Sequence, residues 1–137
     1  MMSEATQQRN IVLILARDLA SMLATPMLIV DAQGELIFYN EAAGVILGRP
    51  FTEAGPVIFR DWARAFDPRD QEGKPVALDE SPLGIVLTER TPAHRTLRFR
   101  SADGVERVVE STAFPLYARA DEFVGGVTVF WGKREEG

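Results

Sequence analysis

The sequence has no cysteine and a single histidine, His94, among its 137 residues. The absence of cysteine excludes disulfide bonds, cysteine-ligated zinc, iron–sulfur clusters and thiolate nucleophiles. A Ser-His-Asp triad would have to use His94, and a site with several histidine ligands is excluded. An enzyme built on this chain would therefore need a buried carboxylate as its general base, for which Glu110 is the candidate.

Long apolar runs are also missing, because the longest, at residues 11–15, is soon followed by Arg17 and Asp18. A membrane-spanning helix needs about 20 apolar residues, and residues 1–10 lack the cleavage pattern of a signal peptide. We therefore expect a cytoplasmic protein with no membrane segment. The net charge of −5 argues against nucleic acid as a partner, since phosphate binding requires a basic surface.

The composition is otherwise that of one soluble globular domain, with 46% hydrophobic and 26% charged residues. Residues 4–24 predict an amphipathic helix that ends before Pro26. One broad apolar stripe is expected to pack on the domain: Ile11, Val12, Leu15, Ala16, Leu19, Met22 and Leu23. Leu13 and Ile14 fall outside that stripe, so the helix is more apolar than packing within one domain requires.

The pattern that follows predicts two strands, three short helical segments and three strands. Residues 27–31 and 35–39 are strands joined by a turn at Gly34, and Asn40 is expected to cap the helix that follows. Helical segments are predicted at residues 57–66 and 79–90, the second capped by Asp79 or Ser81. The last third alternates in the manner of strands, so the fold class is α+β with one antiparallel sheet.

The last strand, at residues 123–133, is apolar at both parities. Phe123, Val127, Val129 and Trp131 share one parity, and Val124 and Phe130 share the other. A strand of this kind is buried on both faces, whereas short helices on one side cover only one of them. We therefore predict that the N-terminal helix or a second subunit covers the other face. The predicted dimer interface comprises Leu13, Ile14, Val124 and Phe130.

A second set of residues has two open interpretations: a modest apolar ligand pocket between helices and sheet, or a filled core. Small residues at one parity of the fourth strand favour some space facing the helices. The candidate pocket residues are Phe59, Trp62, Phe66, Leu83, Val86, Leu87, Leu97, Phe99, Val109, Ser111, Ala113, Val127 and Val129.

Three polar residues invite functional interpretations that we weigh against structural ones. Asn40 is expected to act as a helix cap and to hold the strand end. His94 shares the parity of Arg98 and Arg100, so it is expected at the surface rather than as a haem ligand. Glu110 is expected to be exposed or, if covered, paired with an arginine.

The ordered pattern resembles the PAS family. Its head is "PMLIVDAQGELIFYNEAAGVILG", an apolar strand, Asp31, a turn at Gly34, a second strand ending in Asn40 and an alanine-rich helix ending at Gly48. Further along, "EGKPVALDESPLGIVLTERTP", "DGVERVVESTAFPL" and "FVGGVTVFW" resemble the later loop, helix and closing strands of bacterial sensory PAS domains. The resemblance covers about residues 24–132.

The resemblance implies a five-stranded antiparallel sheet with short helices on one face and a flanking N-terminal helix at residues 1–24. The PAS domain would span residues 25–133, followed by a tail at 134–137. It also implies a non-enzymatic bacterial sensory or regulatory domain that forms homodimers and acts on a signalling output domain such as a kinase, cyclase or transcription regulator. Flavin photochemistry would need a cysteine, and neither flavin nor haem is expected. The alternatives are a dedicated binding protein for a small apolar ligand and an enzyme that uses a buried carboxylate.

Overall fold

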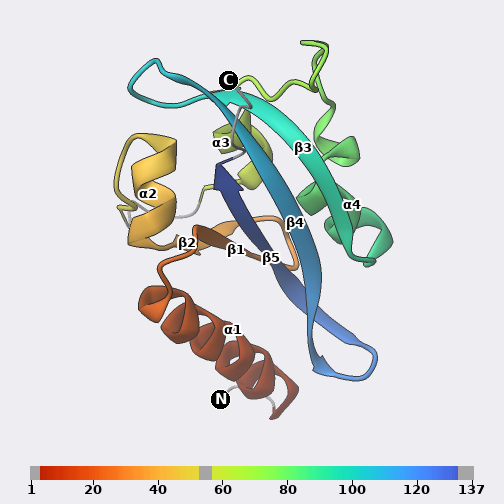
Figure 1. The fold of residues 1–137 in the computed structure, drawn as a ribbon. Helices are drawn as coiled ribbons and strands as arrows, with labels where there is room; N and C mark the ends of the chain where they lie inside the picture. The colour runs from red at the N-terminus through yellow and green to blue at the C-terminus, as the bar shows by residue number, and fades with distance from the viewer. Residues whose placement is uncertain (1–3, 53–56, 133–137) are drawn as a thin grey trace.

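The computed structural model describes residues 4–52 and 57–132, and the side chains of residues 4–10 lie outside that description, as does the predicted tail at 134–137. Figure 1 shows the helices and strands in chain order. They are α1 (Glu4–Met22), β1 (Met27–Asp31), β2 (Leu36–Tyr39), α2 (Glu41–Leu47), α3 (Phe59–Arg64), the 3₁₀ helix η1 (Leu78–Glu80), α4 (Pro82–Glu89), β3 (Ala93–Arg100), β4 (Glu106–Arg119) and β5 (Glu122–Gly132).

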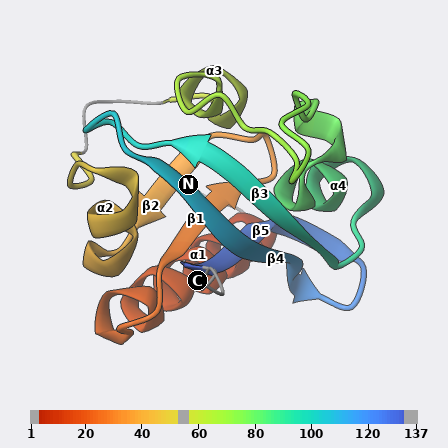
Figure 2. The ribbon, with the colours of Figure 1, turned by 45° about the horizontal axis from the view of Figure 1, so that its top comes forward.

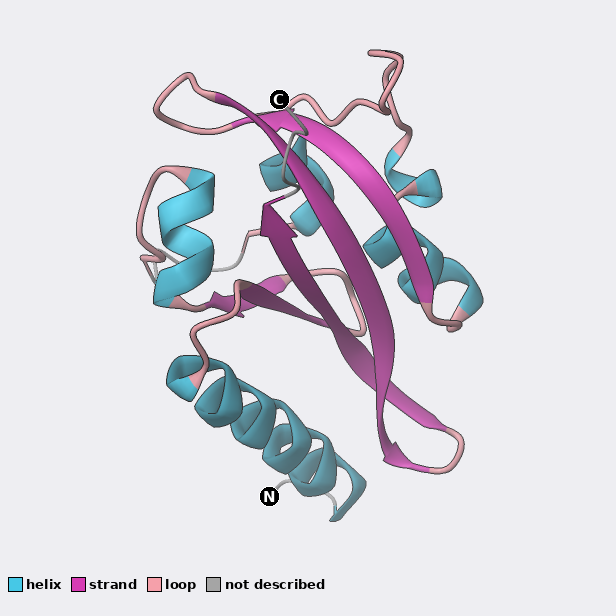
Figure 3. Ribbon diagram, viewed as in Figure 1, coloured by secondary structure: helices cyan, strands magenta, loops and turns pink. Residues whose placement is uncertain are grey.

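The five strands form one sheet in the order β2-β1-β5-β4-β3, and every neighbouring pair is antiparallel (Figure 3). The first and last strands of the chain, β1 and β5, lie side by side at the centre of the sheet. The predicted α+β fold with a five-stranded antiparallel sheet and an N-terminal flanking helix is confirmed.

The helices form two layers around this sheet. Figure 2 shows α3 and α4 on one face, which we call the inner face, and α1 on the opposite, outer face. Leu28, Val109 and Phe130 belong to the inner core, while Ile29 and Val127 pack on the outer side with Ala20 of α1. Because side chains alternate along a strand, each central strand contributes to both cores.

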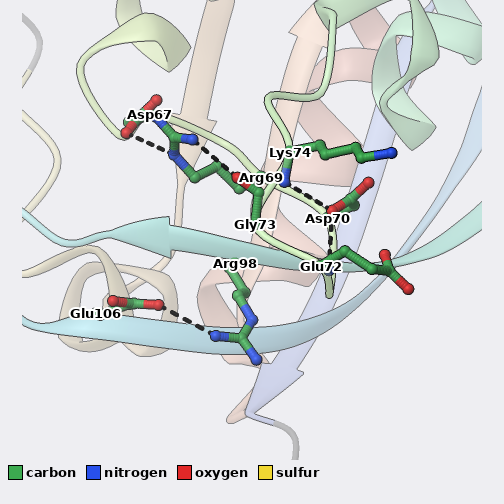
Figure 4. Close-up of polar contacts among 8 residues, drawn as sticks. All are labelled: Asp67, Arg69, Asp70, Glu72, Gly73, Lys74, Arg98 and Glu106. Atoms are coloured by element: carbon green, nitrogen blue, oxygen red, sulfur yellow. Dashed lines mark hydrogen bonds and ion pairs between the residues drawn. The ribbon is translucent and has the colours of Figure 1, made fainter.

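The connection between α3 and η1 protects the edge of the sheet at β3. The backbone groups of Arg69 and Arg98 exchange two hydrogen bonds of 2.8 Å each. Figure 4 shows the side chains at this point: Arg69 donates to the Asp67 carboxylate at 3.0 Å, and Arg98 approaches Glu106 at 3.5 Å. An unpaired edge strand can pair with other chains, so this short bridge covers part of an otherwise open edge.

Helix α1 packs on the sheet along one edge of the predicted stripe, with Ala16 from that stripe and Leu13 and Ala20 from outside it. Ala20 is fully buried, and Leu13 and Ala16 pack beside it against the outer core. Ile14, Leu15 and Met22 remain exposed by 56%, 61% and 77%. The small alanine side chains let the helix approach the strands closely, so this edge, which we call the narrow stripe, faces inward and most of the broad stripe faces solvent. The assignment of Leu13 to a dimer interface is corrected accordingly. None of the described helices is both long and apolar enough to cross a bilayer.

The two faces of β5 are also the reverse of the prediction. Val127 and Val129 belong to the outer core beneath α1, so they are removed from the candidate pocket. Phe130 lies in the inner core, and Val124 is almost fully buried, so neither presents surface for a dimer interface. From Gly126 onward β5 alternates as expected, whereas Phe123, beside an irregularity in the pairing with β4, lies in the inner core with Phe130. Parity alone does not say which set faces the helices.

Candidate functional site: an apolar cavity between the helices and the sheet

A cavity of about 100 Å³ lies between the inner face of the sheet and the segments α3, η1 and α4. Its wall contains no charged side chain, and its polar residues are Ser81, Ser111 and Thr128. Eight of the predicted pocket residues line it: Phe59, Trp62, Phe66, Leu83, Leu97, Phe99, Val109 and Ser111. Val109 and Ser111 of β4 therefore face space, as the sequence pattern suggested.

Three further candidates, Val86, Leu87 and Ala113, pack in or against the inner core but are not part of the cavity wall. Other wall residues were not predicted from the sequence, among them Leu28 of β1, Leu47 of α2, and Thr128 and Phe130 of β5. The sequence contains a signal for Thr128 and Phe130, which is the glycine at position 126 of the same strand. Gly126 shares their parity, and a side chain there would meet Leu83 and Val86 at 2.9 Å. A glycine of a strand that is covered by a packed helix therefore indicates which side-chain parity of that strand faces the helix.

Aromatic rings form one wall of the cavity and continue beyond it. The centroids of Trp62 and Phe66 are 4.8 Å apart, and Phe66 meets the ring of Phe99 edge to face at 6.0 Å. In the other direction, the ring centroids of Tyr39 and Trp62 are 5.8 Å apart. Phe51 contacts Tyr39 at 5.2 Å.

The same chain of rings reaches the outer face of the sheet. Phe51 also meets Phe38 edge to face at 5.5 Å. Because neighbouring residues of a strand point to opposite faces, Phe38 and Tyr39 place their rings on the two sides of β2. The guanidinium of Arg17, on α1, lies 4.9 Å from the Phe38 ring centre. Ring contacts therefore run from α1 around the β2 edge to the cavity.

The phenol of Tyr39 stays neutral beside this wall. Burial raises its pKa, and the positive charge of Arg49 acts in the opposite direction. The hydroxyl donates to the backbone carbonyl of Arg49 at 3.0 Å, which supplies the partner that a buried phenol needs.

Asn40 connects the sheet, α1 and α2. Its Oδ1 accepts from the backbone amides of Ala43 at 2.9 Å, as an N-cap does, and of Met27 at 3.1 Å. Its Nδ2 donates to the carbonyls of Ala20 and Thr25, both at 2.9 Å. The side chain is thus a structural junction in addition to a helix cap.

The two residues considered for catalysis or metal binding lie on the outer face, away from the cavity. Glu110 accepts a hydrogen bond from Thr96 at 2.8 Å, and its other oxygen lies 2.7 Å from Nε2 of His94. The His94 ring is half exposed and 6.1 Å from that of Trp131. Within residues 4–52 and 57–132, no cluster of three acidic or histidine side chains could hold a metal ion.

The cavity does not fit a flavin or a haem. Sites for cofactors and drug-sized ligands occupy about 300–1,000 Å³, three or more times the volume found here. The sequence has no cysteine to react with a flavin. His94, the only histidine, points away from the cavity and cannot serve as an axial haem ligand there.

No protein-family model matches the sequence, and no curated protein matches it at a significant level. Solved structures do match the fold. The PAS domain of a Colwellia psychrerythraea protein aligns with a TM-score of 0.61 and 16% identity over 89% of this chain and 97% of that chain. The Rhodobacter sphaeroides LOV protein gives a TM-score of 0.67 and 14% identity over 98% of this chain and 71% of that chain. The PAS domain of the fruit-fly ELK potassium channel gives a TM-score of 0.67 and 10% identity over 88% of this chain and 95% of that chain. The chain therefore has the fold of a PAS domain.

Proposed function

We propose that this chain is a non-enzymatic regulatory PAS domain of bacterial signal transduction, which acts in the cytoplasm as a homodimer. The fold supports the regulatory role, because PAS domains are typically sensory modules. The dimer would pass its signal to an output domain, such as a kinase, a cyclase or a transcription regulator. Nucleic acid and membrane are not among the proposed partners.

The observation that carries the dimer is the exposed apolar stripe of α1. It comprises Ile11, Ile14, Leu15, Leu19 and Met22, all more than half exposed. Their spacing of three and four residues places them along one side of the helix. A contiguous apolar surface of this kind marks an interaction site in a soluble protein.

A second copy of the chain is the occupant that we propose for this stripe. A two-fold axis beside α1 would bring the same stripe of both copies together, and an interface made by the same patch of both subunits is the commonest form of a homodimer. On the same side of the sheet, Phe114 and Trp131 are about 40% exposed and would extend the buried surface. Of the four interface residues predicted from sequence, Ile14 alone is retained.

The molar mass in solution tests this proposal. We expect a dimer for the natural chain and a monomer for the double variant Leu15→Glu plus Leu19→Glu, measured by light scattering during gel filtration. Val45→Glu is the matched control, because Val45 of α2 is 69% exposed and lies outside the stripe. A natural chain that is monomeric at 100 μM, or a double variant that keeps the dimer mass, contradicts the proposal.

A second candidate function, small-molecule binding, is supported by the cavity. Its hydroxyl-bearing, uncharged wall suits a small apolar ligand rather than a large cofactor. Native mass spectrometry of the freshly purified protein tests it. An added mass of no more than about a hundred daltons on the folded chain is the expected result, because this cavity is smaller than the cavity of about 150 Å³ that binds benzene. A chain that carries no added mass and binds neither benzene nor phenol contradicts this second function.

A further inference from the structure

A carboxylate lies near the middle of the exposed apolar stripe of α1. Asp18 follows Leu15 by three residues and precedes Met22 by four, so the three side chains are neighbours on one side of the helix. Ile14, four residues before Asp18, borders it on the same side. Asp18 is itself exposed. The surface that we propose to be buried in the dimer therefore contains one acidic side chain.

In residues 11–22 of α1, no cation on the side of the stripe compensates that charge. Arg17 is the other charged residue of this range, and its guanidinium lies over the Phe38 ring, against the sheet. The Ser21 hydroxyl donates to the backbone carbonyl of Asp18 at 2.8 Å and not to its carboxylate. Among the residues that the structure describes, the carboxylate has no ion-pair or hydrogen-bond partner. In the single chain, water hydrates this charge.

A two-fold dimer brings Asp18 close to its own copy. The stripe runs from Ile11 to Met22, so its midpoint lies between residues 16 and 17, about 2 Å along the helix from Asp18. An interface made by the same patch of both copies has its centre on the two-fold axis. The two Asp18 side chains are then offset along the helices by at most about 5 Å, whether the helices run parallel or antiparallel.

The pairing of identical copies therefore carries an electrostatic cost. Like charges that face each other across an interface weaken binding, and the repulsion grows as water leaves. Each carboxylate also loses hydration among apolar side chains such as Leu15 and Met22, and the stripe of a second copy offers no cation to replace the water. The apolar contacts favour the dimer, whereas position 18 opposes it.

We infer that Asp18 sets the selectivity of the α1 stripe: the two facing carboxylates keep the pairing of identical copies weak, and a copy with a positive charge at position 18 is the preferred partner. This inference rests on the homodimer proposed above and names the residue that limits its strength. A positive side chain at that point removes the repulsion and supplies the partner that a buried carboxylate needs.

Asp18→Asn removes the charge and nearly keeps the shape of the side chain. We expect its dimer dissociation constant, measured by sedimentation equilibrium, to be at least about fivefold lower than that of the natural chain. Asp61→Asn is the matched control, because it makes the same change at an exposed position of α3, on the opposite face of the sheet from α1 (Figure 2). This control should keep the natural dissociation constant.

Mixed dimers test whether the two side chains at position 18 lie near each other. Asp18→Lys should self-associate as weakly as the natural chain, since two lysines repel each other as two aspartates do. When it is mixed with the natural chain, one of the two being labelled with ¹⁵N, we expect mixed dimers in excess of their random share, measured by native mass spectrometry. Asp61→Lys, with its new charge on α3, should mix at random.

Each outcome supports or overturns the inference. Tighter self-association of Asp18→Asn together with an excess of mixed dimers supports it. An unchanged dissociation constant for Asp18→Asn, or random mixing of Asp18→Lys with the natural chain, overturns it and leaves the homodimer standing. A natural chain that stays monomeric while Asp18→Asn forms dimers contradicts the proposed homodimer and supports the inference. If the natural chain and all of these variants and mixtures are monomeric, both fail.

Discussion

The side-chain amide of Asn40 donates to the backbone carbonyl of Ala20 at 2.9 Å, and this bond joins the junction of β2 and α2 to the last turns of α1. The same amide holds Thr25 in the connection to β1, while its oxygen holds the amides of Met27 and Ala43. The end of α1, the start of β1 and the first turn of α2 therefore depend on one buried side chain, which fixes where α1 leaves the sheet.

Asn40→Ala is expected to destabilise the protein by about 3 kcal/mol, because it removes a helix cap and leaves buried backbone groups without partners. Urea denaturation gives the free energy of unfolding. Gln33→Ala, at an exposed turn residue, is the control and should change it by less than about 0.5 kcal/mol. A loss below about 1 kcal/mol for Asn40→Ala would mean that water replaces the bonds of Asn40.

Gly84→Ala should be among the most damaging single-methyl changes in the chain. A Cβ at this position of α4 would overlap the backbone carbonyl of Leu78 in η1, and backbone cannot rotate away as a side chain can. We expect a loss of at least about 2 kcal/mol in unfolding free energy, measured by thermal denaturation. Gly132→Ala is the matched control, since a Cβ there meets no atom within 4 Å. Equal stability of the two variants would show that η1 moves freely relative to α4.

Thr128→Val is expected to stabilise the ligand-free protein by about 1 kcal/mol, because it replaces a buried hydroxyl that has no partner in the described chain with a methyl group. Differential scanning calorimetry in the absence of added ligand measures the change. Thr112→Val should have the opposite sign, since the Thr112 hydroxyl donates to the carbonyl of Ala93 at 3.3 Å. A destabilised Thr128→Val variant would indicate that the hydroxyl is already satisfied in solution.

The turn at residues 70–74 is expected to loosen in acid. The backbone amide of Lys74 donates to the Asp70 carboxylate at 2.9 Å and holds the pKa of that carboxyl below its ordinary value of 3.8, with a further bond from Glu72 (Figure 4). Because the pKa is lowered in the folded state, the stabilisation is present above pH 3.8 and is lost as the pH falls through the lower folded value.

Amide hydrogen exchange of Lys74 between pH 5 and pH 2 measures this loosening after correction for the intrinsic exchange rate. We expect protection to fall at the acidic end in the natural chain. Asp70→Asn keeps the acceptor oxygen without the titration, so its protection should stay constant over the same range. Protection that falls equally in both chains would assign the effect to other carboxylates.

The elements could be predicted because their signals are local. Alternation, the turn at Gly34, the capping side chain of Asn40 and the prolines place the strands and helices near their observed positions. The order of those elements was enough to suggest the sheet. About half of the cavity wall followed as well, because Trp62 and Phe66 of the helical segment and Val109 and Ser111 of β4 lie on faces that their own periodicity defines.

The choice between faces could not be predicted from the same signals. Parity says that Val127 and Phe130 point in opposite directions, whereas their assignment to the inner or outer face depends on the pairing of β5 with β1 and β4. Helix α1 presents the same problem with two apolar stripes. Its narrow stripe, with Ala16 and Ala20, lies against the sheet because small side chains permit a close approach. A prediction from hydrophobicity alone instead places the wider stripe against the sheet.

The ring contacts around the β2 edge have a consequence for how the protein can be observed. The sheet separates α1 from the cavity, but Arg17, Phe38, Phe51 and Tyr39 connect the helix to Trp62 by direct contact. Indole emission depends on the packing around the ring, so Trp62 is a natural reporter of both compartments. In a Trp131→Phe background its fluorescence should respond to phenol in the cavity and, independently, to the association of two α1 helices on the far side of the sheet.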